Sequence, residues 1–140
     1  MKMCLCLLAL GLATACNRLD TPARVGDRFI DLYFVETDQG RARGLTSGLA
    51  ERKIDDELRL VGEVRRTMNP DQAKPTVEWD RRSLDERGER ARATYDLRIR
   101  QAGDESRRVL QINLERIAGK WTVSNFSVEE LPPGGIPQHR

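Results

Sequence analysis

The sequence predicts an α+β domain whose N-terminal helices pack on a curved four-stranded antiparallel meander sheet. In the first half of the chain, apolar residues such as Val25, Phe29 and Leu32 recur at helical spacing, which indicates a helix with one buried face. After Pro75, apolar and polar residues alternate, which is the pattern of strands with one buried face. Short turns separate these strands, so sequential neighbours are expected to pair directly.

The first helix is predicted to begin at Pro22. Thr21 is a favourable N-cap, and proline suits the first helical position because an N–H is not needed there. The apolar stripe that follows consists of Val25, Phe29, Ile30, Leu32, Tyr33 and Phe34. A helix this apolar on one side is expected to lie over the sheet.

A short second helix is predicted to start at Asp38, which can act as its cap, and to run through Leu49. Gly44 and Gly48 interrupt this stretch. Each glycine weakens a helix by roughly 1 kcal/mol relative to alanine, so the element is expected to be bent.

A third helix is predicted to bury Ile54, Leu58 and Val61, which follow one another at i, i+4 and i+7. Its opposite face is expected to be solvated and carries Glu51, Lys53, Asp55, Asp56 and Arg59. Asn69 is expected to end the helix because Pro70 follows it.

Four strands are predicted after Pro75. Their buried positions are expected to be Val77 and Trp79, then Ala93, Tyr95, Leu97 and Ile99, then Leu110, Ile112 and Leu114, and finally Trp121, Val123, Phe126 and Val128. In the last strand the apolar positions change from odd to even, which predicts a β-bulge near Ser124 and Asn125. Residues 132–140 are rich in proline and glycine and are expected to form a flexible tail.

Residues 1–15 have the layout of a secretory signal peptide, with Lys2 at the start, an apolar middle and small residues at the exit. The apolar run from residue 4 to residue 15 has twelve residues, whereas a transmembrane helix needs about 20. The segment is therefore expected to be cleaved.

The residues at the expected cleavage site, Ala13-Thr14-Ala15-Cys16, resemble a bacterial lipoprotein signal. The resemblance implies cleavage before Cys16 and lipid on its thiol, with residues 16–21 as a short tether. Ala13, where Leu is more usual, and a single Lys2 depart from the consensus. Asn17 is not the Asp that signals inner-membrane retention in some bacteria, so the outer membrane is favoured. A secreted protein without lipid and a retained membrane anchor are the alternatives.

Removal of the signal leaves 125 residues, which is the size of one domain. The mature chain would hold 23 basic and 22 acidic side chains, a balance that argues against nucleic-acid binding. Cys4 and Cys6 leave with the signal, so only Cys16 remains and no disulfide is expected. The single histidine is His139 in the tail, so we expect neither a metal site nor a cofactor.

Three passages resemble the nuclear transport factor two-like (NTF2-like) superfamily, over about residues 22–131. They are Phe29-Ile30-Asp31-Leu32-Tyr33 with Asp38 after it, Leu45-Thr46-Ser47-Gly48-Leu49-Ala50, and Gly88-Glu89-Arg90-Ala91-Arg92-Ala93 leading to Gly119-Lys120-Trp121-Thr122-Val123. The resemblance implies a cone in which helices pack into a strongly bent sheet.

The same superfamily includes enzymes such as ketosteroid isomerase and scytalone dehydratase. Their chemistry would require a carboxylate or a histidine in an apolar pocket. Asp31 is expected to point to solvent, Asp96 has the wrong strand parity, and His139 lies in the tail. We therefore expect no acid/base enzyme.

Two sets of residues are candidates for binding. A small-molecule cavity would be lined by Phe29, Tyr33, Trp79, Tyr95, Trp121 and Phe126, although the same residues would equally fill a core. A polar sheet face would be formed by Arg98, Arg100, Gln111, Asn113 and Glu115. This face would suit a protein partner or a weak homodimer, and it would equally suit solvent.

The sequence therefore predicts a membrane-tethered envelope lipoprotein that acts as a non-enzymatic binding or assembly module. One alternative is a small-molecule binder, or an isomerase-like or dehydratase-like enzyme, of the same fold. Another is an accessory subunit of an envelope secretion machine, which rests on analogy of fold.

Overall fold

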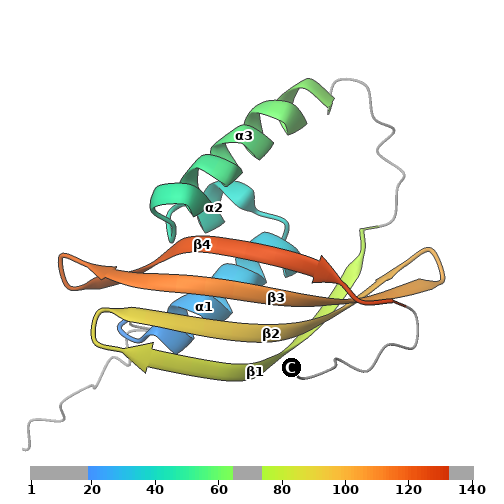
Figure 1. Cartoon of the computed structure of the whole chain (residues 1–140). Helices are drawn as coiled ribbons and strands as arrows, with labels where there is room; N and C mark the ends of the chain where they lie inside the picture. Colours follow the sequence, from blue (N-terminus) through green and yellow to red (C-terminus); the bar gives the residue numbers. More distant parts are fainter. Residues whose placement is uncertain (1–18, 65–73, 133–140) are drawn as a thin grey trace, which may run out of the picture.

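The structure is a computed structural model and describes residues 19–64 and 74–132. Helical elements come first and the strands follow (Figure 1). The helical elements are α1 (Pro22–Ile30), the π-helical turn η1 (Asp31–Val35), α2 (Gln39–Arg43) and α3 (Gly48–Val64). The strands are β1 (Thr76–Arg87), β2 (Arg90–Gln101), β3 (Asp104–Ile117) and β4 (Lys120–Glu130).

The four strands form one antiparallel sheet in the order β1-β2-β3-β4. Helix α1 lies across one face of the sheet, and α3 extends beyond β4 (Figure 1). Because each strand pairs with its sequence neighbour, the short turns close an antiparallel meander. The predicted α+β fold is confirmed.

Helix α1 begins as the sequence predicts, because the Thr21 side chain accepts a hydrogen bond from the Arg24 backbone N–H at 3.3 Å. The regular α-helix ends at Ile30. The chain then widens into η1, where the Glu36 N–H donates to the Asp31 carbonyl, five residues earlier, at 2.7 Å. The wider turn lets both Tyr33 and Phe34 pack against the core.

The predicted second helix is correct at its start and wrong at its end. Asp38 caps α2 by accepting a hydrogen bond from the Arg41 N–H at 2.9 Å. Leu49, however, belongs to α3. The intervening chain bonds to β4 instead of continuing the helix, since the Val123 N–H donates to the Leu45 carbonyl and the Ser47 N–H to the Val123 carbonyl, each at 2.9 Å.

Two expectations for α3 are wrong. Ile54 is buried as predicted, but Leu58 is 38% exposed because this part of α3 leads away from the sheet (Figure 1). Lys53 was assigned to the solvated face, yet its ammonium group donates to the Asn125 side chain at 2.9 Å and to the Phe126 carbonyl at 2.6 Å. The predicted helix end at Asn69 lies outside the described residues.

The predicted bulge in β4 is confirmed. Asn113 pairs with Asn125 and Leu114 pairs with Val123, so Ser124 is the extra residue. A second irregularity at Arg82 in β1 was not predicted. Both bulges bend the sheet around the core that α1 covers.

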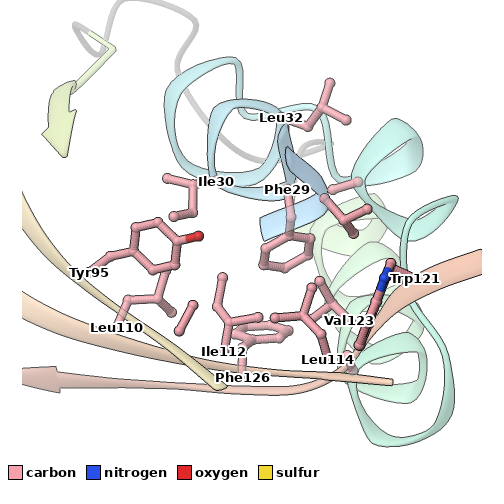
Figure 2. Packing of buried hydrophobic residues seen from close by; sticks show 14 of the residues in the cluster. Phe29, Ile30, Leu32, Tyr95, Leu110, Ile112, Leu114, Trp121, Val123 and Phe126 are labelled. Carbon is pink, nitrogen blue, oxygen red and sulfur yellow. The ribbon is translucent and has the colours of Figure 1, made fainter. Parts of the chain in front are cut away.

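The core lies between α1, the start of α3 and the inner face of the sheet (Figure 2). Its fully buried members include Val25, Phe29, Ile30, Ile54, Ala93, Tyr95, Leu110, Ile112 and Val123. Within residues 19–64 and 74–132, none of the helices combines the length and the apolar character needed to cross a membrane.

Candidate functional site

The six aromatic residues proposed as a pocket lining lie in or against the core. Phe29 and Tyr95 are fully buried, and Trp121 and Phe126 are each 6% exposed. The Phe29 ring stacks on Tyr33, with 5.4 Å between centroids, and lies 5.2 Å from the Phe126 ring. Figure 2 shows Phe29 pointing from the helix toward Phe126 on the sheet. Trp79 meets Tyr95 edge to face at 5.6 Å.

A polar seam, formed by Asp27, Arg81 and Tyr95, joins α1 to β1 and β2. The Tyr95 hydroxyl donates to Asp27 Oδ1 at 3.0 Å, and Arg81 Nη1 donates to both Asp27 oxygens at 2.9 Å. Sequence reasoning missed Asp27. The available signal was its spacing, because Asp27 and Asp31 stand at i and i+4 and so share a helix face beside the apolar stripe.

Asp31 does not point to solvent, and that expectation is wrong. Its carboxylate accepts a hydrogen bond from Trp79 Nε1 at 3.0 Å. The partly buried indole N–H needs an acceptor, which turns Asp31 toward β1. Asp96, by contrast, lies on the outer face of the sheet, as its strand parity predicted, and pairs with Arg82.

A second tyrosine links η1 to α3. The Tyr33 hydroxyl donates to the Glu57 carboxylate, with distances of 2.6 Å and 2.5 Å to its two oxygens. Burial raises the pKa of Tyr33, and the hydrogen bond to Glu57 raises it further. Burial likewise raises the pKa of Tyr95, followed by the charge of Asp27. Each hydroxyl therefore acts as a neutral donor that holds a helix in place.

The raised pKa values of Tyr33 and Tyr95 predict that the folded protein loses stability at alkaline pH. A raised folded-state pKa means that the folded protein binds the phenolic proton more tightly than the unfolded chain, whose tyrosines titrate near pH 10. The stabilisation is thus complete below about pH 10 and is lost as the pH rises above it. Tyr33 and Tyr95 are the only tyrosines. Absorbance titration should show no tyrosinate until the protein unfolds, when both ionise together.

Tyr33→Phe provides the control for this titration, because it should halve the tyrosinate signal that appears on unfolding. Circular dichroism on the same samples reports whether the fold is intact. A tyrosine that ionises near pH 10 in a natively folded sample would contradict the proposed role of the two hydroxyls.

The outer face of the sheet is polar. Glu78 accepts hydrogen bonds from Arg98 at 3.2 Å and from Arg100 at 3.0 Å. Arg100 also donates to Glu105 at 3.0 Å, which lowers the pKa of that carboxyl. Gln111, Asn113 and Glu115 share this face, as the alternation predicted. Single exposed pairs of this kind contribute little stability.

Several hollows open on the surface of the described residues. One of about 270 Å³ is bordered by charged residues of the sheet, among them Asp80 and Arg107. A larger one of about 510 Å³ lies between the start of α3 and the strands, beside Leu49 and Arg92. None of the six aromatic residues borders either hollow.

Arg108 is a feature that sequence reasoning missed. It pairs with Leu97 on β2, so it lies at the end of the inner face of the sheet. Its Nε is the one buried side-chain nitrogen or oxygen in the described ranges without a hydrogen-bond partner. A guanidinium N–H in this position suits a carboxylate or phosphate oxygen. The sequence did hold a signal, because Arg108 alternates with Leu110 and Ile112 and so belongs to the same face of β3.

Two candidate residues cannot be placed. Cys16, the expected site of lipid attachment, and His139 lie outside the described residues. Among residues 19–64 and 74–132, no group of three or more His, Cys, Asp or Glu side chains is arranged to hold a metal ion.

Comparison with solved structures finds a designed NTF2-like protein, a variant of Rd1NTF2_05. It is 18% identical to this chain, the match covers 76% of this chain and 96% of the designed one, and the TM-score is 0.53. No protein-family model and no curated protein matches the sequence. Together with the element order and the bent four-stranded sheet, this likeness shows that the chain has an NTF2-like fold.

Proposed function

We propose that the protein is a lipid-anchored lipoprotein of a bacterial envelope whose NTF2-like domain serves as a non-enzymatic binding or assembly module. The observation that carries the anchor is the sequence Ala13-Thr14-Ala15-Cys16 after a short apolar segment. Lipid on Cys16 would hold the domain at the membrane. The outer membrane is favoured because Asn17 follows the cysteine.

A non-enzymatic role is supported by the way the partly buried polar groups beside the core are used. Asp27 accepts from Tyr95 and Arg81, Asp31 accepts from Trp79, and Glu57 accepts from Tyr33. Each of these carboxylates thus ties a helix to another element. A general base must instead be aimed at a proton of the substrate. The contacts of these three carboxylates therefore favour a structural role over acid/base catalysis.

The surface offered to a partner is the polar sheet face. Its alternating guanidinium and carboxylate groups around Glu78 and Arg100 would complement a protein surface of mixed charge. The partner would be another envelope protein, as in an accessory subunit of a secretion machine, or a second copy in a weak homodimer. Pull-down from detergent extracts would separate these partners from a small-molecule ligand.

A small anionic ligand is the second candidate, because Arg108 has a buried N–H without an acceptor. A thermal-shift screen of small carboxylates and phosphates on the wild type and on Arg108→Met tests it. Ligands that stabilise only the wild type would support this function. Equal shifts in both proteins would exclude Arg108 as the contact.

The anchor is tested by Cys16→Ser. We expect this variant to lose incorporation of labelled fatty acid and to move from the membrane fraction to the soluble fraction, because one thiol carries the lipid. Cys4→Ser and Cys6→Ser, in the signal segment just before Cys16, are matched controls and should leave labelling unchanged. Persistent labelling of Cys16→Ser would refute the anchor.

A further inference from the structure

We infer that one end of the sheet faces the lipid surface, and that this end consists of the β1–β2 turn at Gly88 and the β3–β4 turn at Gly119. The inference rests on the proposed lipid anchor at Cys16. It adds the orientation of the domain and a contact surface for lipid headgroups.

The course of α1 relative to β1 places the tether at this end. Asp31 bonds to Trp79 and Asp27 bonds to Arg81, so the two elements run in opposite directions. Toward its start at Thr21, α1 therefore approaches the Gly88 end of β1. Figure 1 shows the blue start of α1 at the end of the sheet where β1 turns into β2.

The tether is too short to hold this end away from the membrane. From Arg81 to Gly88 the chain rises about 23 Å, whereas from Asp27 to Thr21 the helix rises about 9 Å. The turn thus lies about 14 Å beyond the start of α1. From Thr21 to Cys16, five residues span at most about 18 Å. A lipid on Cys16 could therefore reach no more than about 4 Å beyond the turn.

The two turns form one joined surface. The Arg116 backbone N–H donates to the Glu89 carbonyl at 2.8 Å, which ties the β3–β4 turn to the β1–β2 turn. Ile117 is 49% exposed there, and Lys120 is exposed beside it. An apolar side chain flanked by basic ones suits a boundary between acyl chains and anionic headgroups.

The two ends of the sheet also differ in charge, and the difference favours the same orientation. At the Gly88–Gly119 end, residues 86–91 and 116–121 hold four basic and two acidic side chains. At the opposite end, residues 100–105 around the β2–β3 turn hold one basic and two acidic side chains. Anionic lipid therefore favours the first end.

The chain offers a matched pair of probe positions. Ala118 and Ala102 occupy equivalent Ala-Gly turns, with φ of 49° and 51°, at opposite ends of β3. The two positions are separated by about 45 Å along the strand. Because lipid blocks the thiol of Cys16, a cysteine introduced at either position would be the single free thiol.

The test uses Ala118→Cys and Ala102→Cys in the processed, lipidated chain that begins at Cys16. Each is labelled with a fluorophore and placed in vesicles of phosphatidylethanolamine and phosphatidylglycerol that contain a headgroup-spin-labelled lipid. We expect fluorescence to be lost at residue 118 and retained at residue 102. Adding Ile117→Glu and Lys120→Glu to Ala118→Cys should reduce the loss, since both changes repel anionic lipid.

The outcomes separate this inference from the proposed function. Equal loss at both positions would mean that the sheet lies flat on the membrane, and greater loss at residue 102 would mean the reverse orientation. Either result overturns the inference and leaves the anchor standing. Failure of Cys16 to incorporate labelled fatty acid overturns the proposed function, and the inference with it.

Discussion

Phe29→Ala is expected to lower the free energy of unfolding by about 4 kcal/mol, the range for a phenylalanine removed from a packed core. Phe29 is fully buried, and its ring contacts both Tyr33 on η1 and Phe126 on β4. The substitution removes the side chain through which the helical layer meets the sheet. Urea unfolding followed by circular dichroism measures the change.

Leu60→Ala is the control for this experiment. Leu60 is 58% exposed on α3, so its loss is expected to change the stability by no more than about 0.5 kcal/mol. A loss below about 2 kcal/mol for Phe29→Ala would mean that Phe29 is not tightly packed against its neighbours. The described packing of the aromatic core would then be wrong.

Gly26→Ala is expected to destabilise the protein by about 2 kcal/mol, within the range for overpacking. A Cβ at this position would lie 2.5 Å from the Tyr95 hydroxyl oxygen. The hydroxyl would have to leave its bond to Asp27, and α1 would have to move away from the sheet. The sign is unusual, because Gly→Ala inside a helix ordinarily stabilises by roughly 1 kcal/mol.

Two further variants isolate the cause. Gly62→Ala in α3 meets no atom within 4 Å, and it should show the ordinary stabilisation of up to about 1 kcal/mol. In a Tyr95→Phe background the oxygen is gone and the nearest ring carbon lies 3.5 Å away, so Gly26→Ala should become neutral or stabilising. Equal effects of Gly26→Ala in both backgrounds would exclude the hydroxyl as the obstacle.

Most of the sheet could be predicted from the sequence, although the irregularity at Arg82 was not, and Val128, predicted to be buried, is 39% exposed. A period of two assigns each residue to one face, so the buried residues of β2 and β3 and the bulge at Ser124 follow from alternation alone. The turns at Gly103 and Gly119 confirm the strand boundaries, because a positive φ suits glycine there. Both signals are local.

The helices were less predictable because distant contacts determine their limits and faces. The boundary between α2 and α3 depends on two hydrogen bonds with β4, one accepted by the Leu45 carbonyl and one donated by the Ser47 N–H. Leu58 is exposed because α3 extends past the sheet, and the sequence of the helix itself holds no sign of that.

The polar contacts of the candidate site were missed for a related reason. Asp27 and Asp31 face partners on β1 and β2 that come 48 to 68 residues later in the chain. A single charged residue next to an apolar stripe is usually a solvated one, so the i, i+4 spacing of Asp27 and Asp31 was only a weak signal. Arg108 was readable, since it stands in register with the apolar positions of β3.

The segment that bonds to Val123 affects how copies of the protein could meet. It occupies part of the outer edge of β4, so a foreign strand cannot add there without displacing it. The other outer strand, β1, is dense in charge and irregular at Arg82, and both features discourage strand addition. Lipid anchoring would crowd these domains into a plane, where edge-to-edge aggregation is a hazard. These two features would discourage edge-to-edge strand pairing between crowded copies.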